Sequence, residues 1–560
     1  MEILEEKNKN KGYKPILDGI ADWPVYQLSK NRKEFLDEVS QKAIERIVEM
    51  RPVAKDLFGE LESTILREQN RVKRNLWRAD PPDDKQFWGK LRDELTSSSA
   101  DGNPEAQRAI LTQIITRYTA QIAGHFKPSS YRFARRVIKF WFSRLLNGAR
   151  MNSIFGFFKS KYTLRDKMQI VGKVKMLRRL ARKGTIVMVP THFSNIDSIL
   201  IGWVIHSLGL PAFIYGAGLN LFNIKIFAYF MNSLGSYKVD RRKKSVIYME
   251  TLKMYSTIAI MKGAHSLFFP GGTRSRSGAI EQNLKRGLLS SAVEAQRNLF
   301  LENKDEQVTK IFIVPVTLNT HFVLEAPELI EDYLHSKGQD HYFPETDKYG
   351  SFQFLRFLFK FFTKGSNISV SIGQAMDVIG NYVDAEGNSL DKQFRPITTR
   401  DYFVSGGSVC VDHQRETEYT RILSQRIVEE YFAIHRIFSS HLSAFVAFEM
   451  WMRKYPMLDL FSLLRLPEEE LEIEYAEFRA AFKRVRKAIL RLEEKGKVSI
   501  AGHLTGKTDK AIQLGIDNVG IFHLNRPLLR NKKGNIVTKD LTLLYYYHNR
   551  LAGYDFEQYI

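Results

Sequence analysis

The chain has 560 residues, of which 44% are hydrophobic, so it is long enough to bury a large core in more than one domain. A single cysteine, Cys410, excludes an intrachain disulfide and suits a reducing compartment. The 84 Lys and Arg residues exceed the 62 Asp and Glu residues. The resulting formal net charge of +22 implies an anionic partner, for which nucleic acid, anionic lipid headgroups and acidic acyl donors are the candidates.

Helical periodicity dominates the first part of the chain. It is clearest over Lys30–Leu57, Glu60–Trp77 and Ala106–Ile122, and a Pro-Pro-Asp-Asp sequence interrupts it after Asp80. We therefore predict an N-terminal helical domain over residues 1–150. The charged start of the chain lacks an apolar stretch, so we expect neither a secretory signal nor a transit peptide.

Short β-branched stretches alternate with amphipathic helical patterns over residues 160–330, which is typical of an α/β sheet. Turn residues are frequent from there to residue 415. Long helical patterns dominate from Glu416 onward, although Lys497–Asn535 is more strand- and turn-like. We therefore predict an α/β domain over residues 151–415 and a mainly helical C-terminal domain over residues 416–560.

The most informative motif follows Thr185–Pro190, an apolar stretch ending in proline that predicts a buried strand. The sequence continues T-His192-F-S-N-I-Asp197, and the apolar run from Ser198 predicts the next helix. A carboxylate about one and a half turns into that helix can accept the Nδ1 proton of the imidazole, which leaves Nε2 free to take a proton from an alcohol. The positive end of the helix dipole keeps the imidazole neutral. Alone, the segment fits a helix-capping aspartate beside a structural histidine equally well.

A glycine-rich segment further along the chain, F-F-P-G-G-T-Arg274-S-Arg276-S-G, follows the strand-like Leu267–Phe269. Glycines let backbone N–H groups approach an anion, and arginine binds phosphate through two parallel hydrogen bonds. An ordinary glycine-rich turn with solvated arginines is the alternative interpretation of this segment alone.

Two further segments complete an ordered set of four. Arg241 and Arg242 follow the predicted strand Tyr237–Val239 and would bring more cations to the same edge of the sheet, although surface salt bridges are the commoner role of such residues. The last segment is the apolar I-F-I-V-Pro315-V. Together the four segments favour a base and its orienting carboxylate beside a site for a phosphorylated substrate.

In this order the segments resemble the glycerolipid acyltransferases, a superfamily with a His-x4-Asp motif and a Pro-x-Gly-Thr-Arg-type phosphate motif. The closer resemblance is to the large membrane-bound glycerol-3-phosphate acyltransferases. Four stretches are similar to further blocks of that subgroup: G-L-P-A-F-I-Y-G-A-G-L-Asn220-L, L-Lys285-R-Gly287-L-L-S, H-F-V-L-E and L-L-Y-Y-Y-H-Asn549-R-L-A. The resemblance covers residues 165–330, with weaker similarity near Asp377–Tyr402 and at the C-terminus.

The resemblance implies a mixed sheet flanked by helices and gives roles to individual residues. His192 would be the general base on the sn-1 hydroxyl of glycerol 3-phosphate, and Asp197 would be its orienting partner. The residues implied in binding the substrate phosphate are Arg241, Gly272, Arg274, Ser275 and Lys285, and those implied in supporting the site are Asn220 and Pro315. The product would be lysophosphatidate, the first intermediate of phospholipid synthesis.

One residue departs from the family pattern, because the family usually has Glu where this chain has Gly271. That Glu is thought to help seat the acceptor. Acylation of lysophosphatidate, or of another phosphorylated alcohol, therefore stays open as an alternative to acylation of glycerol 3-phosphate.

The implied chemistry is direct transfer from acyl-CoA or acyl-acyl-carrier protein to the acceptor oxygen, without a covalent acyl-enzyme. The chain has no G-x-S-x-G elbow, and Cys410 is more simply interpreted as a buried small residue than as a nucleophile. We expect no cofactor and no metal, since the acidic turn Val383–Asp391 lacks the ligand spacing of a calcium hand.

Two segments, Tyr131–Leu146 and Phe352–Lys364, interleave basic and aromatic residues as membrane-surface helices do, and the basic stretch Lys173–Lys183 leads into the catalytic strand. Each also fits a helix that packs its apolar side on the core. No nucleic-acid-binding motif is present, so an anionic membrane surface is the predicted partner and nucleic acid is not. We expect a peripheral or monotopic protein at the cytoplasmic face of a bacterial inner membrane.

The uncharged stretch Ser198–Asn223 is long enough to be considered as a membrane span. Its glycines and proline, and the two motifs on either side that must meet, favour a core helix followed by a strand. A non-catalytic membrane-binding protein with a degenerate acyltransferase domain is the alternative from another class. The intact His192 and Asp197 argue against it.

Overall fold

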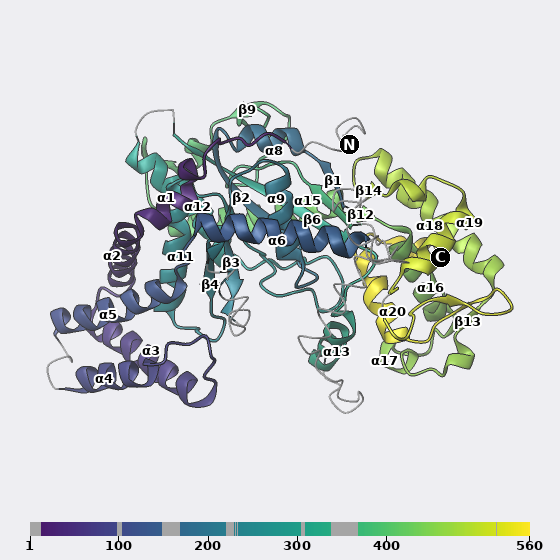
Figure 1. Ribbon diagram of the computed structural model, residues 1–560, viewed down its shortest axis with the longest axis horizontal. Coiled ribbons are helices and arrows are strands. Elements are labelled where there is room, and N and C mark those ends of the chain that lie inside the picture. The colour runs from purple at the N-terminus through teal and green to yellow at the C-terminus, as the bar shows by residue number, and fades with distance from the viewer. Residues whose placement is uncertain are drawn as a thin grey trace.

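A computed structural model describes residues 13–97, 103–147, 168–219, 229, 231, 233–303, 308–337, 368–521 and 523–560, with the backbone alone for residues 138–147. The predicted aromatic segment Phe352–Lys364 and the predicted site residue Asn220 lie outside these ranges. The N-terminal helices and the C-terminal helical region lie at opposite ends of the long axis, and a sheet lies between them (Figure 1).

In the described ranges, six α-helices precede the sheet: α1 (Pro24–Lys30), α2 (Arg32–Met50), α3 (Ala54–Arg74), α4 (Asp84–Thr96), α5 (Pro104–Ile122) and α6 (Pro128–Asn147). The predicted N-terminal helical region is thus confirmed. The helical periodicity over Lys30–Leu57 corresponds to two helices, because the chain leaves helical geometry between Met50 and Ala54. Pro52 lies in this break, where its ring and missing N–H disfavour continuation of a helix.

The central sheet has seven strands in the order β1-β7-β6-β2-β5-β3-β4. Their bounds are β1 (Met168–Gly172), β2 (Gly184–Pro190), β3 (Ile214–Gly218), β4 (Ser236–Val239), β5 (Ser266–Leu267), β6 (Lys310–Thr320) and β7 (Ile368–Ile372). Strands β6, β2, β5, β3 and β4 are mutually parallel, whereas β7 pairs antiparallel with β6 and carries β1 beside it. The predicted mixed sheet flanked by helices is confirmed.

Strand β2 is buried on both faces, and its side chains alternate between two hydrophobic clusters. Ile186 and Met188 join the cluster that contains Leu200 of α9 (Asp197–Ser207). Val187 and Val189 join the opposite cluster, to which α12 (Gly287–Glu302) and α15 (His413–Ile434) contribute. This two-sided burial explains why the sequence of β2 is continuously apolar rather than alternating.

The uncharged stretch that begins at Ser198 folds as predicted where it is described, as helix α9 followed by β3. Helix α11 (Val246–Met261) follows β4 and packs on both α12 and α2. Two further helices near the sheet are α8 (Val174–Leu180) and α13 (Ala326–Ser336). Among the helices in the described ranges, none is both long enough and apolar enough to cross a membrane.

The C-terminal region contains α16 (Ser439–Lys454), α17 (Leu460–Leu463), α18 (Tyr475–Glu494), α19 (Thr508–Asn518) and α20 (Leu541–His548), with short two-residue strands between them. The strand- and turn-like prediction for Lys497–Asn535 is wrong where α19 forms. Helix α19 buries Ala511, Ile512, Gly515 and Ile516 on one face. A Cβ on Gly515 would lie 2.5 Å from the carbonyl oxygen of Ser439, so this glycine permits close packing on α16 rather than a turn.

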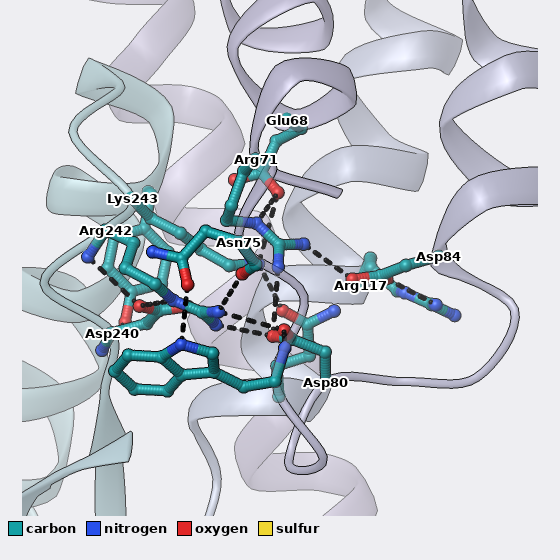
Figure 2. A network of polar contacts seen from close by, with 12 residues as sticks. Glu68, Arg71, Asn75, Asp80, Asp84, Arg117, Asp240, Arg242 and Lys243 are labelled. Atoms are coloured by element: carbon teal, nitrogen blue, oxygen red, sulfur yellow. Dashed lines mark hydrogen bonds and ion pairs between the residues drawn. The ribbon is translucent and has the colours of Figure 1, made fainter. Parts of the chain in front are cut away.

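A network of buried charges joins the N-terminal helices to the loop between β4 and α11 (Figure 2). Arg71 of α3 contacts three carboxylates, those of Glu68, Asp80 and Asp84, at 2.7, 3.0 and 2.6 Å. Asp80 in turn accepts two hydrogen bonds from Arg242, at 3.0 and 2.6 Å. Burial opposes the charge on Arg71, but the surrounding carboxylates outweigh it and raise the pKa of the guanidinium.

Replacement of Arg71 by Met should therefore loosen the contact between the N-terminal helices and the sheet. Three buried carboxylates would lose their shared cation, and breaking a buried ion pair on one side costs about 3–5 kcal/mol. Amide hydrogen exchange measured by mass spectrometry should show faster exchange in α3 and α4 of Arg71→Met. Lys73→Met on the exposed side of the same helix is the control, and equal exchange in the two variants would contradict the prediction.

Candidate active site

His192 lies in the turn that connects β2 to α9, on the edge of the sheet where the parallel strands end. Its Nδ1 atom is 3.1 Å from Oδ2 of Asp197. The same oxygen accepts hydrogen bonds from the backbone N–H groups of Phe193 and Ser194, at 2.7 and 2.8 Å. Asp197 therefore fixes both the turn and the imidazole. It is the first residue of α9, so the prediction that it lies well inside the helix is wrong.

The imidazole of His192 is held on its second side by an aromatic ring. Phe269 stacks on it with 4.1 Å between ring centroids and 25° between planes. The His192 side chain remains 17% exposed, whereas that of Asp197 is 3% exposed. With the buried carboxylate accepting the Nδ1 proton, Nε2 carries the lone pair and can accept a proton from a bound alcohol.

The glycine-rich loop after β5 lies directly against this turn. The backbone N–H of Ser275 donates to the carbonyl oxygen of His192 at 2.8 Å, while the Ser275 hydroxyl donates to the carbonyl oxygen of Ala279. Gly272 has a φ of +77°, and a Cβ there would lie 2.7 Å from Cδ of Lys285. The loop therefore needs glycine at this position both for its backbone conformation and for the lysine that lies across it. His192, Gly272, Ser275 and Lys285 are thus brought together.

The two consecutive arginines after β4 differ in their contacts. Arg242 stacks on Trp77 with its Cζ 4.0 Å from the ring centroid, and it is held by Asp80 and Asp240. Arg241 makes no hydrogen bond or ion pair with any side chain in the described ranges. Desolvation lowers the pKa of the Arg241 guanidinium, and the positive charge of Arg274 lowers it further. Arg241 and Arg274 are therefore neighbouring like charges, an arrangement that an anion would stabilise.

Glu325, the last residue of the H-F-V-L-E stretch, had no predicted role, yet it connects the parts of the site. This buried residue precedes α13, and its Oε2 accepts a hydrogen bond from the Ser194 hydroxyl at 2.9 Å. Its Oε1 accepts from the backbone N–H of Asn195 at 3.0 Å and lies 3.3 Å from Nη1 of Arg274. The carboxylate therefore links the histidine turn to the arginine loop. The signals in the sequence were the similarity of H-F-V-L-E to a family block and the position of this glutamate directly before Ala-Pro at a helix start.

The C-terminal helix α20 and the residues after it form the floor beneath this loop. Asn549 donates to the carbonyl oxygen of Ser277 at 2.9 Å, across 272 residues of chain. Arg550 is 1% exposed and lies with its Cζ 3.4 Å above the centroid of the Phe193 ring. Its Nε and Nη1 atoms have no hydrogen-bond partner among the described residues. Burial lowers the pKa of Arg550, whereas the nearby Tyr546, Tyr547 and Asp197 act in the opposite direction.

The remaining predicted residues have more distant or indirect places. Pro315 is paired in register with Val189 of β2, and its carbonyl oxygen accepts a hydrogen bond from Gly373 at 2.9 Å. A Cβ on Gly271 would lie 3.2 Å from Cγ of Glu281, so a carboxylate side chain from another position packs against this glycine. In the part of the chain that the structure describes, no group of three or more His, Cys, Asp or Glu side chains is arranged to hold a metal ion.

Comparisons with known proteins match part of this chain. A family profile described as Acyltransferase matches residues 172–319. A glycerol-3-phosphate acyltransferase of Pseudomonas fluorescens (strain SBW25) is 25% identical over 37% of this chain and 22% of its own length. Another, of Pseudomonas syringae pv. syringae (strain B728a), is 23% identical over 52% of this chain and 32% of its own length. The chain thus spans less than a third of each of these curated relatives.

A solved structure, the 1-acyl-sn-glycerophosphate (LPA) acyltransferase PlsC from Thermotoga maritima, is 15% identical with a TM-score of 0.24, and the match covers 57% of this chain and 94% of that chain.

The matched segment runs from the end of β1 into β6, so it includes His192, the arginine loop and the parallel strands that position them. Residues 172–319 form an acyltransferase domain. Over the matched part, the chain is similar to the glycerolipid acyltransferases.

Gly278 offers a test of how α20 supports the arginine loop. It has a φ of +85°, and a Cβ there would lie 2.1 Å from the carbonyl oxygen of Tyr546. Gly278→Ala should therefore lower the free energy of unfolding by about 2–4 kcal/mol, from backbone strain together with overpacking. Denaturant unfolding of the full chain would measure this.

Gly287→Ala is the matched control, since a Cβ on Gly287 would meet nothing within 4 Å. If both variants unfolded at the denaturant concentration of the unsubstituted protein, the loop would not depend on its contact with α20.

Proposed function

We propose that this protein transfers a fatty acyl group from acyl-CoA or acyl-acyl-carrier protein to the sn-1 hydroxyl of glycerol 3-phosphate, giving lysophosphatidate. The observation that carries the proposal is the arrangement of one base and one anion site. His192 has its Nδ1 held by Asp197 at 3.1 Å, and Arg241 lies beside Arg274 without a carboxylate partner of its own among the described residues. A phosphorylated alcohol matches both features, because its phosphate suits the arginines and its hydroxyl suits the base.

In the proposed reaction, Nε2 of His192 removes the hydroxyl proton of the acceptor as its oxygen attacks the thioester carbonyl. A carbon–oxygen bond forms, the carbon–sulfur bond breaks, and the protonated imidazole returns its proton to the leaving thiolate. Asp197 stabilises the imidazolium between these two steps, since its carboxylate faces Nδ1. Lys285, across Gly272, would add a further positive charge for the acceptor phosphate.

Acylation of lysophosphatidate is the second candidate. Gly271 has no side chain where the family usually has Glu, and a Cβ there would lie 3.2 Å from Cγ of Glu281. Because that family Glu is thought to help seat the acceptor, its absence favours testing an acceptor other than glycerol 3-phosphate. A non-catalytic membrane-binding protein is the third candidate, and a chain without transfer activity on any acceptor would favour it.

Attachment to an anionic membrane surface is part of the proposal. Phe133 on α6 is 53% exposed and lies in the sequence between Arg132 and Arg135, which are also exposed, so the exposed part of α6 carries an aromatic residue together with two cations. This combination suits a membrane interface that carries negative headgroups. The proposed location is the cytoplasmic face of a bacterial inner membrane, where phosphorylated acceptors and acyl donors are both present.

Replacement of His192 tests the reaction directly. Transfer from palmitoyl-CoA would be measured with glycerol 3-phosphate, dihydroxyacetone phosphate and lysophosphatidate offered separately in the presence of anionic vesicles. His192→Ala should reduce the rate on glycerol 3-phosphate at least ~100-fold, the lower end expected for removal of a general base. The exposed His125 provides the control variant His125→Ala. Activity on lysophosphatidate alone would keep the mechanism and reassign the acceptor.

Arg241 and Arg274 should act on the acceptor rather than on the donor. Arg241→Met or Arg274→Met should raise KM for glycerol 3-phosphate by about tenfold to a hundredfold, since a charge-assisted hydrogen bond to phosphate is lost. KM for palmitoyl-CoA should change little. Arg276→Met, an exposed arginine of the same loop, is the matched control. An equal effect of all three substitutions would rule out a specific role for the first two.

A further inference from the structure

A cavity with a volume of about 500 Å³ lies between α3 and the loop that joins β4 to α11. Six of its lining residues are cationic: Arg67, Arg71, Arg74, Arg242, Lys243 and Lys244. Only one lining residue, Glu68, is acidic. The cavity does not belong to the histidine turn or to the arginine loop, whose residues do not line it.

The cations at the base of the cavity have protein partners that neutralise or hold them. Arg71 and Arg242 are held by buried carboxylates, and Nζ of Lys243 lies 2.6 Å from the side-chain oxygen of Gln121 and 3.6 Å from Glu68 (Figure 2). Burial lowers the pKa of Lys243. These groups are rigidly positioned, because each is fixed by at least two partners.

The cations at the rim are different. Arg67, Arg74 and Lys244 are exposed, and Arg67 only donates to the backbone carbonyl of Lys244, at 3.3 Å. The side chains of Arg74 and Lys244 make no hydrogen bond or ion pair within the described ranges. The rim therefore carries positive charge without a protein counter-ion, above a base whose charges are already paired. Such a concave site attracts an anion.

The position of the cavity relative to His192 and Arg241 indicates which anion of the reaction it could bind. Strands β2 and β4 are parallel members of one sheet with β5 and β3 between them, so their ends lie three strand spacings apart, about 14 Å. Arg242 lines the cavity, whereas its neighbour Arg241 lies beside Arg274. An acceptor phosphate is only a few bonds from its reacting hydroxyl and must lie near His192. Because Arg241 and Arg274 are assigned to that phosphate, the cavity is left for a second anion of the same reaction.

We propose that this cavity binds the phosphorylated nucleotide end of acyl-CoA, with the pantetheine arm running along the sheet edge to the thioester at His192. The proposal rests on the proposed function, since it names the donor of that reaction. The nucleotide end of CoA carries several phosphate groups, which suit three rim cations without a carboxylate partner in the described ranges. A flexible arm separates these phosphate groups from the reacting carbonyl. A carrier-protein donor presents the arm without the nucleotide, so it would not need these residues.

The test is the double substitution Arg74→Gln with Lys244→Gln in the full chain. Isothermal titration calorimetry would give the Kd of free CoA and of dephospho-CoA, and steady-state assays would give KM for palmitoyl-CoA. We expect CoA to bind at least about tenfold more weakly to the double variant, and KM to rise more than kcat falls. Lys532→Gln with Lys533→Gln, two exposed lysines of the C-terminal region, removes the same charge and should leave all values unchanged.

Two further variants separate loss of binding from loss of structure. Arg74→Lys with Lys244→Arg keeps both charges and should restore most of the CoA affinity, whereas a merely structural defect would not be restored. Both substituted side chains are exposed, and a thermal melt of each variant would show whether the fold is retained.

An equal Kd for CoA in the double variant and in the lysine control would overturn the proposal. Weaker binding to anionic vesicles with unchanged binding of CoA would also overturn it and assign the cavity to lipid headgroups. Because CoA binding is measured without an acceptor, the test is independent of the proposed reaction. If CoA binding depended on the rim residues but no acceptor were acylated, the proposed CoA site would stand and the proposed reaction would not. If the double variant transferred acyl groups with an unaltered KM for palmitoyl-CoA, the proposed CoA site would be rejected and the proposed reaction would stand.

Discussion

The carboxylate of Glu325 is the point at which the separate segments of the site meet. It accepts hydrogen bonds from Ser194 and Asn195 in the turn after β2, and it pairs with Arg274 in the loop after β5. A buried carboxylate is costly unless it is hydrogen-bonded or paired, so Glu325 stabilises only the arrangement in which both loops reach it. The geometry of His192 therefore depends on a residue that lies 133 positions further along the chain.

The N-terminal helices contribute to the site through a second set of charges. Asp80 and Asp240 bind the guanidinium of Arg242, and Trp77 covers it, so the loop after β4 has a fixed conformation. That loop also carries Arg241, which has no carboxylate partner within the described ranges and lies near Arg274. The ion pairs of one arginine thus position its neighbour for an anion. Because these pairs are buried, they favour one arrangement of the loop over others rather than adding much net stability.

The C-terminal region also holds the loops of the site in place. Helix α20 places Asn549 against the arginine loop and Arg550 over Phe193, the residue after the histidine. The hydrophobic cluster of this region also includes Phe193 and residues of α13. The parallel strands bring the loops to one edge, and helices from both ends of the chain then fix their conformations. The site is consequently a product of the whole chain and not of the matched segment alone.

Much of this was accessible from local sequence. The apolar Thr185–Pro190, the spacing of His192 and Asp197, and the glycines before Arg274 predicted a strand, a polar turn and an anion-binding loop, because periodicity and glycine conformation are local properties. Tertiary structure alone decided that Arg242 is neutralised while Arg241 is not, since the partners of Arg242 come from a different helical region. It also decided the roles of Glu325 and Arg550 in the site, because buried charges are defined by neighbours distant in sequence.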